Sequence, residues 1–386
     1  MIPYGRQDIS EADIQAVVDV LRSDWLTQGP AVPRFEQAVQ DWTGAGFATA
    51  VSSATAGLHI ACAAVGLGPG DILWTSPNTF VATANAARYC GAEVEFIDID
   101  PKTYNLSVEC LEQRLKVAER RRRLPKVVMP VHFAGQSCEM YAIHRLSDKY
   151  GFRIIEDASH AIGGRYRGCP IGSGKFSDAV ILSFHPVKII TTGEGGMVLT
   201  NDSKVHDRLQ RLRTHGITRN PDHMTEKSHG PWYYQQIELG WNYRMTDIQA
   251  ALGASQMQRL CEFVEQRRQI SQRYDQALAH LPIVRPWQHP DTESSWHLYV
   301  IQLDLDRIKA TRQLVFDTLR QRGIGVNIHY IPVNTQPYYT NRGSPPRETP
   351  AALNYYDRAI SLPLYTGLTE PMQQTVIRSI EECLAS

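Results

Sequence analysis

The sequence has no excess of charge of either sign, and this limits the partners it can bind. Its 386 residues contain 40 Lys and Arg against 40 Asp and Glu, so the formal net charge at pH 7 is +0. Proteins that bind nucleic acid or a membrane surface normally carry a basic excess or a basic patch. We therefore expect neither nucleic acid nor a membrane among the partners of this chain.

Long apolar runs are also missing from the sequence. No stretch approaches the roughly 18 uninterrupted apolar residues that a membrane-spanning helix needs. Residues 1–13 are polar and acidic, unlike the start of a secretory signal. These two features predict a cytoplasmic protein.

The cysteines are few and lie far apart. There are seven, an odd number, and none forms a C-x-x-C pair. Neither a disulfide framework nor a metal site is indicated by this spacing, and free thiols in a reducing compartment are expected.

Short apolar runs that end in small or acidic residues alternate with helical stretches from about residue 47. Strands that alternate with helices predict an α/β fold in which a mostly parallel sheet lies between helices. Ligands of such folds bind at the carboxyl ends of the strands. The predicted strands are 47–51, 71–75, 94–98, 126–131, 152–157 and 179–183.

The C-terminal third has a different pattern. After residues 245–252 one long helical pattern runs to about Leu281. It is followed by a strand at 297–303, a helix near 311–321, the segment Gly325–His329 and a terminal helix after Glu370. We predict a large domain over residues 1–250, which includes an N-terminal segment that contacts substrate, and a smaller α+β domain over 251–386.

A first candidate site lies between a strand and a helix in residues 51–59, V-S-S-A-T-A-G-L-H. The unpaired N–H groups at the start of a helix, flanked by Ser and Thr, hold a phosphate well. An ordinary capped helix explains the same residues.

A second candidate site is the end of the strand in F-R-I-I-E-D-A-S-H-A. Asp157 ends this strand and His160 follows three residues later. The carboxylate can pair with a cationic group of a ligand that His160 also reaches, although an acid at a strand end is more often only a helix cap.

A third candidate is Lys188, in S-F-H-P-V-K-I-I-T-T-G-E-G-G. A lysine between apolar segments has a lowered pKa and is a competent amine nucleophile. The alternative is a lysine whose stem covers a sheet edge while its amine stays in water.

These three segments and the turn G-W-N-Y-R-M-T-D-I-Q-A at residues 240–250 together describe a pyridoxal phosphate (PLP) site. The four motifs, in this order, resemble the DegT/DnrJ/EryC1/StrS family of sugar aminotransferases. The resemblance covers nearly the whole chain. It implies the fold of PLP-dependent aminotransferases of fold type I.

The resemblance also implies residue roles. Lys188 would form the Schiff base with PLP and move the proton during catalysis, and Asp157 would keep the pyridine nitrogen protonated. His160 would contact the phenolic oxygen, where many relatives carry Gln. Asn242 would reach the cofactor of a neighbouring subunit, which implies a homodimer with shared active sites. The other implied cofactor contacts are Ala54, Thr55, Ala56 and Ser183 at the phosphate, and Phe80 stacked on the ring.

Within the family, the opening I-P-Y-G-R-Q and residues 23–30, 131–137 and 230–234 look most like the transaminases of pseudaminic acid biosynthesis. This likeness implies transfer of the amino group of L-glutamate to C4 of UDP-2-acetamido-2,6-dideoxy-β-L-arabino-hex-4-ulose, a UDP-4-keto-6-deoxy-N-acetylhexosamine. The alternatives for the substrate are a UDP-4-keto sugar of D-xylo configuration and a 4-keto pentose. A sugar dehydratase, against which Lys188 argues, and a non-catalytic binding or regulatory protein, against which Lys188 and Asp157 argue, are the alternatives for the activity. The implied substrate contacts are Tyr4, Asp24, Trp25, Leu26, Thr27, Ala54, Ser183, Asn327, Ile328, His329 and Tyr330.

Overall fold

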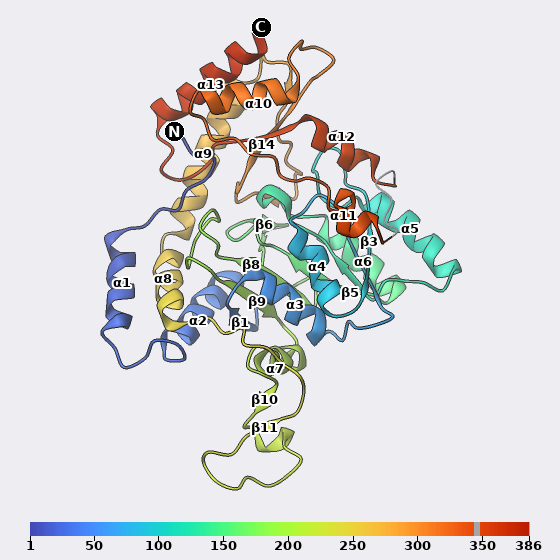
Figure 1. The fold of residues 1–386 in the computed structure, drawn as a ribbon, viewed down its shortest axis with the longest axis vertical. Coiled ribbons are helices and arrows are strands. Elements are labelled where there is room, and N and C mark those ends of the chain that lie inside the picture. Colours follow the sequence, from blue (N-terminus) through green and yellow to red (C-terminus); the bar gives the residue numbers. More distant parts are fainter. Residues whose placement is uncertain (343–347, 386) are drawn as a thin grey trace.

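A seven-stranded sheet forms the centre of the computed structural model, which describes residues 1–342 and 348–385 (Figure 1). The strand order is β1-β9-β8-β5-β4-β2-β3. Only β9 runs antiparallel to its neighbours, so the predicted α/β fold with a mostly parallel, mixed sheet is confirmed. The strands are β1 (Phe47–Val51), β2 (Ile72–Thr75), β3 (Glu93–Phe96), β4 (Val127–Met129), β5 (Arg153–Asp157), β8 (Ala179–Ser183) and β9 (Gly196–Thr200).

Different helices cover the two faces of this sheet, because successive side chains of a strand point to opposite faces. Val180 and Leu182 of β8 pack in one apolar cluster with α2 and α8, whereas Ile181 packs in another with α3 and α7. Both faces are therefore buried, as a mostly parallel sheet requires. The helices around the sheet are α1 (Glu11–Leu21), α2 (Ala31–Thr43), α3 (Ala54–Ala64), α4 (Val81–Tyr89), α5 (Val108–Arg120), α6 (Met140–Tyr150), α7 (Ser203–Leu212) and α8 (Asp247–Met257).

A second, antiparallel sheet lies in the C-terminal part of the chain, with the order β12-β14-β15. Its apolar side chains form one core cluster with those of α9, α10 and α13. The predicted strand, helix and terminal helix of this part are confirmed. The elements are β12 (Ile283–Val284), β14 (Tyr299–Leu303), β15 (Ala359–Leu362), α9 (Leu260–Ala277), α10 (Arg312–Gln321), α12 (Pro350–Arg358) and α13 (Glu370–Ala385).

The predicted long helix is two helices. α8 ends at Met257 and α9 begins at Leu260, so the prediction of one continuous helix to Leu281 was wrong. The predicted boundary at 250/251 falls inside α8, which packs against α1 and α2. Ile2 pairs with Ile324, so the first residues of the chain join the C-terminal part. The division into two domains stays a prediction.

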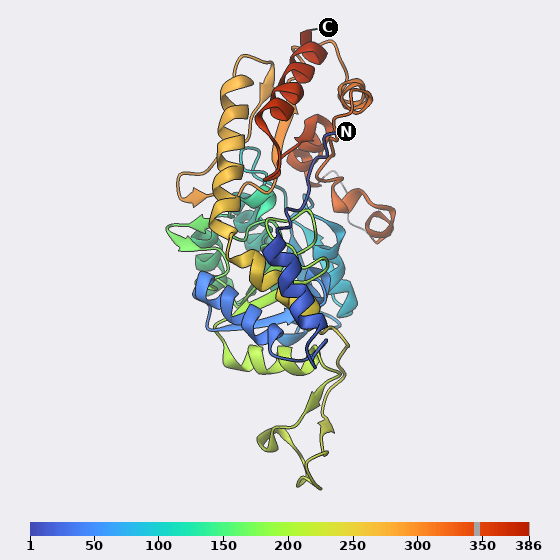
Figure 2. The same cartoon turned by 90° about the vertical axis from the view of Figure 1, so that its left-hand side faces the viewer.

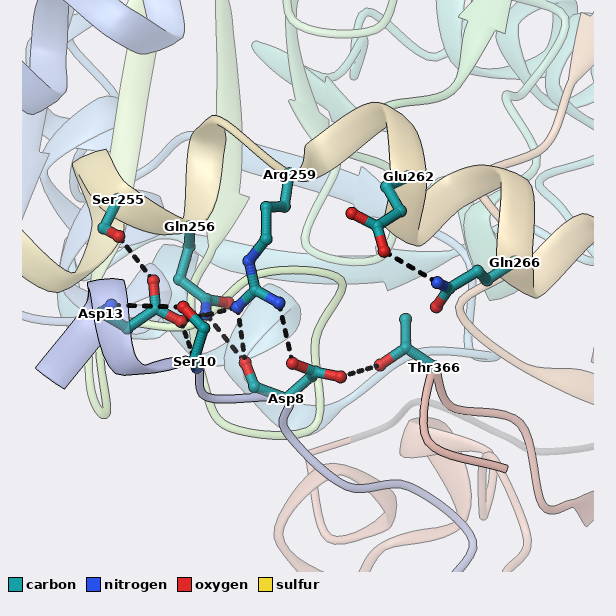
Figure 3. Close-up of polar contacts among 9 residues, drawn as sticks. All are labelled: Asp8, Ser10, Asp13, Ser255, Gln256, Arg259, Glu262, Gln266 and Thr366. Carbon is teal, nitrogen blue, oxygen red and sulfur yellow. Dashed lines mark hydrogen bonds and ion pairs between the residues drawn. The ribbon is translucent and has the colours of Figure 1, made fainter. Parts of the chain in front are cut away.

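The break between α8 and α9 is occupied by an ion-pair cluster that we call the Arg259 clamp (Figure 3). The guanidinium of Arg259 donates to Asp8 over 2.9 Å and to Asp13 over 2.6 Å. The carboxyl group of Asp13 is fully buried and also accepts from Ser255 and Gln256. The clamp therefore holds the N-terminal segment against the junction of the two helices.

An extended arm leaves the body of the molecule beyond α7, on the side opposite the C-terminus (Figures 1 and 2). It contains the short pair β10 (Ile217–Thr218) and β11 (Gln235–Gln236). Several large apolar side chains of the arm are exposed, with Trp232 at 72% and Leu239 at 76%.

None of the described helices has the length and apolarity that a membrane span requires. The remaining short elements are β6 (Arg165–Tyr166), β7 (Cys169–Pro170), β13 (Thr292–Glu293) and α11 (Pro337–Thr340).

Candidate active site

A pocket of about 560 Å³ lies at the carboxyl ends of the central strands. Asp157 is the last residue of β5 and Ser183 the last of β8, and both line the pocket. The start of α3, which follows β1, closes one side, and residues 327–330 of the C-terminal part close another. The pocket therefore lies where an open α/β sheet is expected to bind its ligand.

The start of α3 has the form of a phosphate cradle. Ser53 is the N-cap and its hydroxyl accepts from the N–H of Ala56 over 3.1 Å. The N–H groups of Ala54 and Thr55, the next residues of the helix, have no intrahelical partner by geometry and lie at the pocket. A Cβ atom at Gly196 would lie 2.5 Å from the Ala54 nitrogen, so only glycine lets β9 pass this close. This cradle fits a phosphate group.

Asp157 is buried and held in a fixed orientation. Its Oδ1 accepts from the N–H of Ser159 over 3.1 Å and from the Ser159 hydroxyl over 2.6 Å. Its Oδ2 accepts from the Thr83 hydroxyl over 2.7 Å. A carboxylate oxygen takes two hydrogen bonds, so Oδ2 keeps one free position for a protonated ring nitrogen.

Lys188 lies in the same pocket, past the end of β8. Burial lowers the pKa of Lys188 to about 8, and the nearby Asp157 opposes this effect only in part. An amine with a pKa near 8 is partly unprotonated at neutral pH, so it can attack a carbonyl carbon and exchange protons. The prediction of a lowered pKa at Lys188 is confirmed.

His160 lines the pocket with both of its ring nitrogens engaged. Nδ1 accepts from the N–H of Ala134 over 3.3 Å, and Nε2 lies 3.0 Å from the hydroxyl oxygen of Tyr330. Burial, with further contributions from Lys188 and His329, holds the pKa of His160 well below its usual value. The ring is therefore neutral at pH 7.

The C-terminal part contributes a polar wall. Nδ1 of His329 lies 2.8 Å from the Ser361 hydroxyl, and burial lowers the pKa of His329 to about 3. The ring of Tyr4, from the N-terminal segment, lies 5.5 Å from the ring of His329. The carbonyl of Tyr4 accepts from the N–H of Leu364, which fixes the segment on this wall.

The pocket brings together most of the site residues predicted from the sequence. Ala56 lies one residue inside the cradle and is buried, and Phe80 lies at the start of α4 with 58% of its surface exposed. Asn242 and residues 24–27 are exposed and do not line the pocket, and their roles stay predictions. The predicted residues that line it are Tyr4, Ala54, Thr55, Phe80, Asp157, His160, Ser183, Lys188, Asn327, Ile328, His329 and Tyr330.

Several residues that line or support the pocket have no role predicted from the sequence. Thr83 and Ser159 hold Asp157, and Gly196 allows the close approach of β9 to α3. The spacing D-x-S at 157–159 was a usable signal, because an Asp side chain often accepts from the backbone two residues later. His297 comes from a segment far along the chain, and no local pattern marks it.

A phosphate cradle, a buried carboxylate and an amine of lowered pKa on one sheet edge define a PLP-dependent enzyme of the α/β class. The DegT/DnrJ/EryC1/StrS aminotransferase family matches residues 7–381, and the chain belongs to this family. The family is PLP-dependent, and the solved structures similar to this chain include PLP and PMP forms.

Three relatives match the chain over nearly its whole length. The spore coat polysaccharide biosynthesis protein SpsC of Bacillus subtilis is 39% identical over 384 residues, which are 99% of this chain and 96% of SpsC. PseC of Helicobacter pylori, an aminotransferase involved in the biosynthesis of pseudoaminic acid, is 29% identical with a TM-score of 0.89, covering 100% of this chain and 99% of PseC. The putative sugar aminotransferase Spr1654 of Streptococcus pneumoniae gives the same identity, coverage and TM-score.

Proposed function

We propose that this aminotransferase moves the amino group of L-glutamate to C4 of UDP-2-acetamido-2,6-dideoxy-β-L-arabino-hex-4-ulose, giving UDP-4-amino-4,6-dideoxy-N-acetyl-β-L-altrosamine. The observation that carries amino transfer is the pairing of Lys188 and Asp157 in one pocket with the cradle of α3. The choice of sugar is supported by the full-length match to PseC.

The residues of the pocket divide the chemistry among them. Bound PLP supplies an electron sink for the carbon that loses or gains a proton. Asp157 accepts the hydrogen bond of the pyridine nitrogen and keeps it protonated, which preserves that sink. Lys188 would hold the cofactor and would move the proton to and from the reacting carbon. The N–H groups of Ala54 and Thr55, with Ser183, hold the phosphate.

We further propose a homodimer whose subunits complete each other's active sites. Asn242 is exposed and does not line the pocket of its own subunit, as is expected of a residue that serves a neighbouring site. The arm that precedes it exposes Trp232, Tyr234 and Leu239, a set of apolar side chains suited to cover by a second copy. The exposed residues 24–27 would also contact substrate in the assembled dimer.

The shared site is tested by mixing two inactive variants. Lys188→Ala lacks the amine and Asn242→Ala lacks the contact to the neighbouring site, so each homodimer is impaired. A mixed dimer contains one site with both residues intact, and we expect the activity to rise on mixing and subunit exchange. No gain after exchange, shown by tagged subunits, would contradict shared sites.

A second candidate is an aminotransferase acting on another keto sugar, such as the D-xylo epimer. The specific observation in its favour is the higher identity to SpsC, a spore coat polysaccharide biosynthesis protein. Both candidates use the same cofactor residues, so only the sugar distinguishes them.

A competition assay separates the two candidates. The PLP-loaded protein is given L-glutamate and equal amounts of the L-arabino and D-xylo UDP-4-keto sugars, and the products are identified by mass and NMR. Preferential amination of the L-arabino sugar supports the proposal, and amination of only the D-xylo sugar replaces it with the second candidate. Lys188→Ala, which should aminate neither sugar, is the control for uncatalysed reaction.

A further inference from the structure

Asp247, the first residue of α8, also holds the start of α2. Its Oδ2 accepts from the backbone N–H of Ala31 over 3.3 Å, and its Oδ1 accepts from that of Val32 over 3.4 Å. These are the first two residues of α2, and their N–H groups have no partner within that helix. Pro30, at the N-cap position, makes no side-chain hydrogen bond to them. The carboxyl group of Asp247 therefore caps α2, although it lies 216 residues after Ala31 in the chain.

The same residue holds the loop of residues 23–30, which lies between α1 and α2. The backbone N–H of Asp247 donates to the Leu26 carbonyl over 3.1 Å. Asp247 is 1% exposed, so this bond and the two bonds to α2 are shielded from water. A Cβ atom at Gly29 would lie 2.4 Å from Asp247 Oδ2 and 2.3 Å from Trp25 Cβ. Only glycine therefore lets the loop fold this closely over the carboxyl group.

The loop leaves its large apolar side chains uncovered, although its backbone is held. Trp25 is 57% exposed and Leu26 is 45% exposed. The Ser23 hydroxyl accepts from the N–H of Trp25 over 3.1 Å, which fixes the backbone at the start of the loop. Figure 1 shows the two helices that flank the loop, α1 and α2, beside α8, and both pack against it. A held backbone that presents uncovered apolar side chains is a preformed contact surface.

Asp247 connects two groups of predicted site residues that lie outside the pocket of their own subunit. Residues 24–27 are predicted to contact the nucleotide sugar, and Asn242 is predicted to reach the cofactor of the neighbouring subunit. Both groups are exposed, and neither lines the pocket of its own chain. Five residues of extended chain span at most about 18 Å, so Asn242 lies within this distance of Asp247 and close to the loop. The two groups therefore belong to one region of the surface.

We propose that Asp247 is a positioning residue that holds residues 24–27 for the active site of the partner subunit. The loop and Asn242 then form one contribution that each subunit makes to the sugar-binding end of its partner's pocket. The inference rests on the shared active sites of the proposed function. The loop serves the nucleotide sugar and not L-glutamate, because the UDP-sugar extends much further from the reacting carbon than L-glutamate does.

The first test compares KM for the two substrates in single variants. The PLP-loaded protein is assayed with L-glutamate and with whichever of the two UDP-4-keto sugars the unmodified protein aminates. We expect Asp247→Ala to raise KM for the sugar roughly tenfold and to leave KM for L-glutamate unchanged. Asp247→Asn should give a smaller rise, because its oxygen still accepts from one N–H group. Gly29→Ala keeps the carboxyl group but displaces the loop, so it should reproduce the rise.

The matched control is Asp202→Ala. Asp202 is the N-cap of α7 and accepts from the N–H groups of Lys204 and Val205. This variant removes a cap of the same kind from a helix that carries no predicted site residue, and neither KM should change. Hydrogen exchange of peptides from the start of α2 checks the bonds without any substrate, and exchange should be faster in Asp247→Ala than in the unmodified protein.

A mixed dimer shows which active site the loop serves. Subunits with Asp247→Ala and differently tagged subunits with Lys188→Ala are exchanged, and the dimer that carries both tags is purified. Its one intact Lys188 belongs to the Asp247→Ala subunit, and the pocket of that subunit receives a loop held by an intact Asp247. We expect KM for the sugar to return to the value of the unmodified protein, which a purely structural role of Asp247 in its own subunit would not produce.

Three results would overturn the proposal. They are an unchanged KM for the sugar in both Asp247→Ala and Gly29→Ala, an equal rise in KM for both substrates, and a mixed dimer whose KM stays at the Asp247→Ala value. The mixed dimer of Asn242→Ala and Lys188→Ala separates this failure from failure of the shared sites. If that dimer regains activity and the Asp247 dimer does not, the subunits share sites without help from the loop. If neither recovers, the shared site itself is rejected.

Discussion

The hydroxyl group of Thr83 donates a 2.7 Å hydrogen bond to Oδ2 of Asp157, and the Thr79 hydroxyl lies 2.7 Å from Thr83 Oγ1 in turn. These two hydrogen bonds link the start of α4 to the end of β5. They fix the carboxylate that is expected to pair with the pyridine nitrogen of the cofactor. The orientation of Asp157 therefore depends in part on Thr83, a residue with no proposed role in the chemical steps.

Removing this hydroxyl group should impair both half-reactions. Hydrogen bonds to charged groups contribute about 1.5–3 kcal/mol. We expect Thr83→Val to lower kcat roughly tenfold or more, because the carboxylate loses its fixed orientation. Thr83→Ser should recover most of the rate. Stopped-flow measurement of the reaction with L-glutamate checks this, and a full rate in Thr83→Val would refute the role of Thr83.

The cradle at α3 should not tolerate a side chain on β9. A Cβ atom at Gly196 would meet backbone atoms of Ser53 and Ala54 within 2.7 Å. Overpacking of this kind costs about 1–3 kcal/mol, and here it would displace the phosphate-binding N–H groups. We expect Gly196→Ala to weaken PLP binding roughly tenfold or more. The control is Gly68→Ala, since nothing lies within 4 Å of a Cβ at Gly68. Equal PLP affinity in both variants would contradict the cradle.

The reactivity of Lys188 should depend on pH with a midpoint near its own pKa. Only the unprotonated amine attacks a carbonyl group, and burial lowers the pKa of Lys188 to about 8. The rate at which PLP becomes covalently attached to the cofactor-free protein should therefore rise with pH and level off above pH 8. The rate is read from the growth of the visible band. A midpoint near the ordinary lysine value of about 10.4 would show that burial does not activate this amine.

The Arg259 clamp should contribute to the stability of the fold and to binding of the sugar substrate. Removing one partner of a buried ion pair costs about 3 kcal/mol or more, and the Asp13 carboxyl group is fully buried. We expect Arg259→Met to lower the free energy of unfolding by about this amount. It should also raise KM for the sugar more than KM for L-glutamate, because Tyr4 lies four residues before Asp8 on the same segment.

The matched control for the clamp is Arg268→Ala. Arg268 pairs with Glu265 on an exposed face of α9, and such surface pairs contribute about 0–1 kcal/mol. If both variants lose the same stability in denaturant titrations, the clamp has no special role.

The strands and the central site could be predicted because their signals are local. Asp157 and Ser183 end apolar runs, and such runs mark both the strand and the edge at which it ends. Lys188 is recognisable because a lone amine between apolar segments is unusual. These features depend on spacing along the chain, which a single sequence displays.

The supporting contacts could not be predicted, because they join distant segments. Thr83 and Asp157 are 74 residues apart, and His160 and Tyr330 are 170 residues apart. The break at Arg259 was missed for the same reason: the local pattern is helical throughout, and the aspartates that hold the break lie about 250 residues earlier.

The most direct test of the account follows the nitrogen atom. The PLP-loaded protein is incubated with ¹⁵N-labelled L-glutamate and the L-arabino UDP-4-keto sugar, and the product is examined by NMR. We expect one ¹⁵N bonded to C4 of the sugar with the intact protein, and none with Lys188→Ala. A sugar without ¹⁵N at C4 after reaction with the intact protein would contradict this transfer, and so would a ¹⁵N-labelled amino sugar from Lys188→Ala.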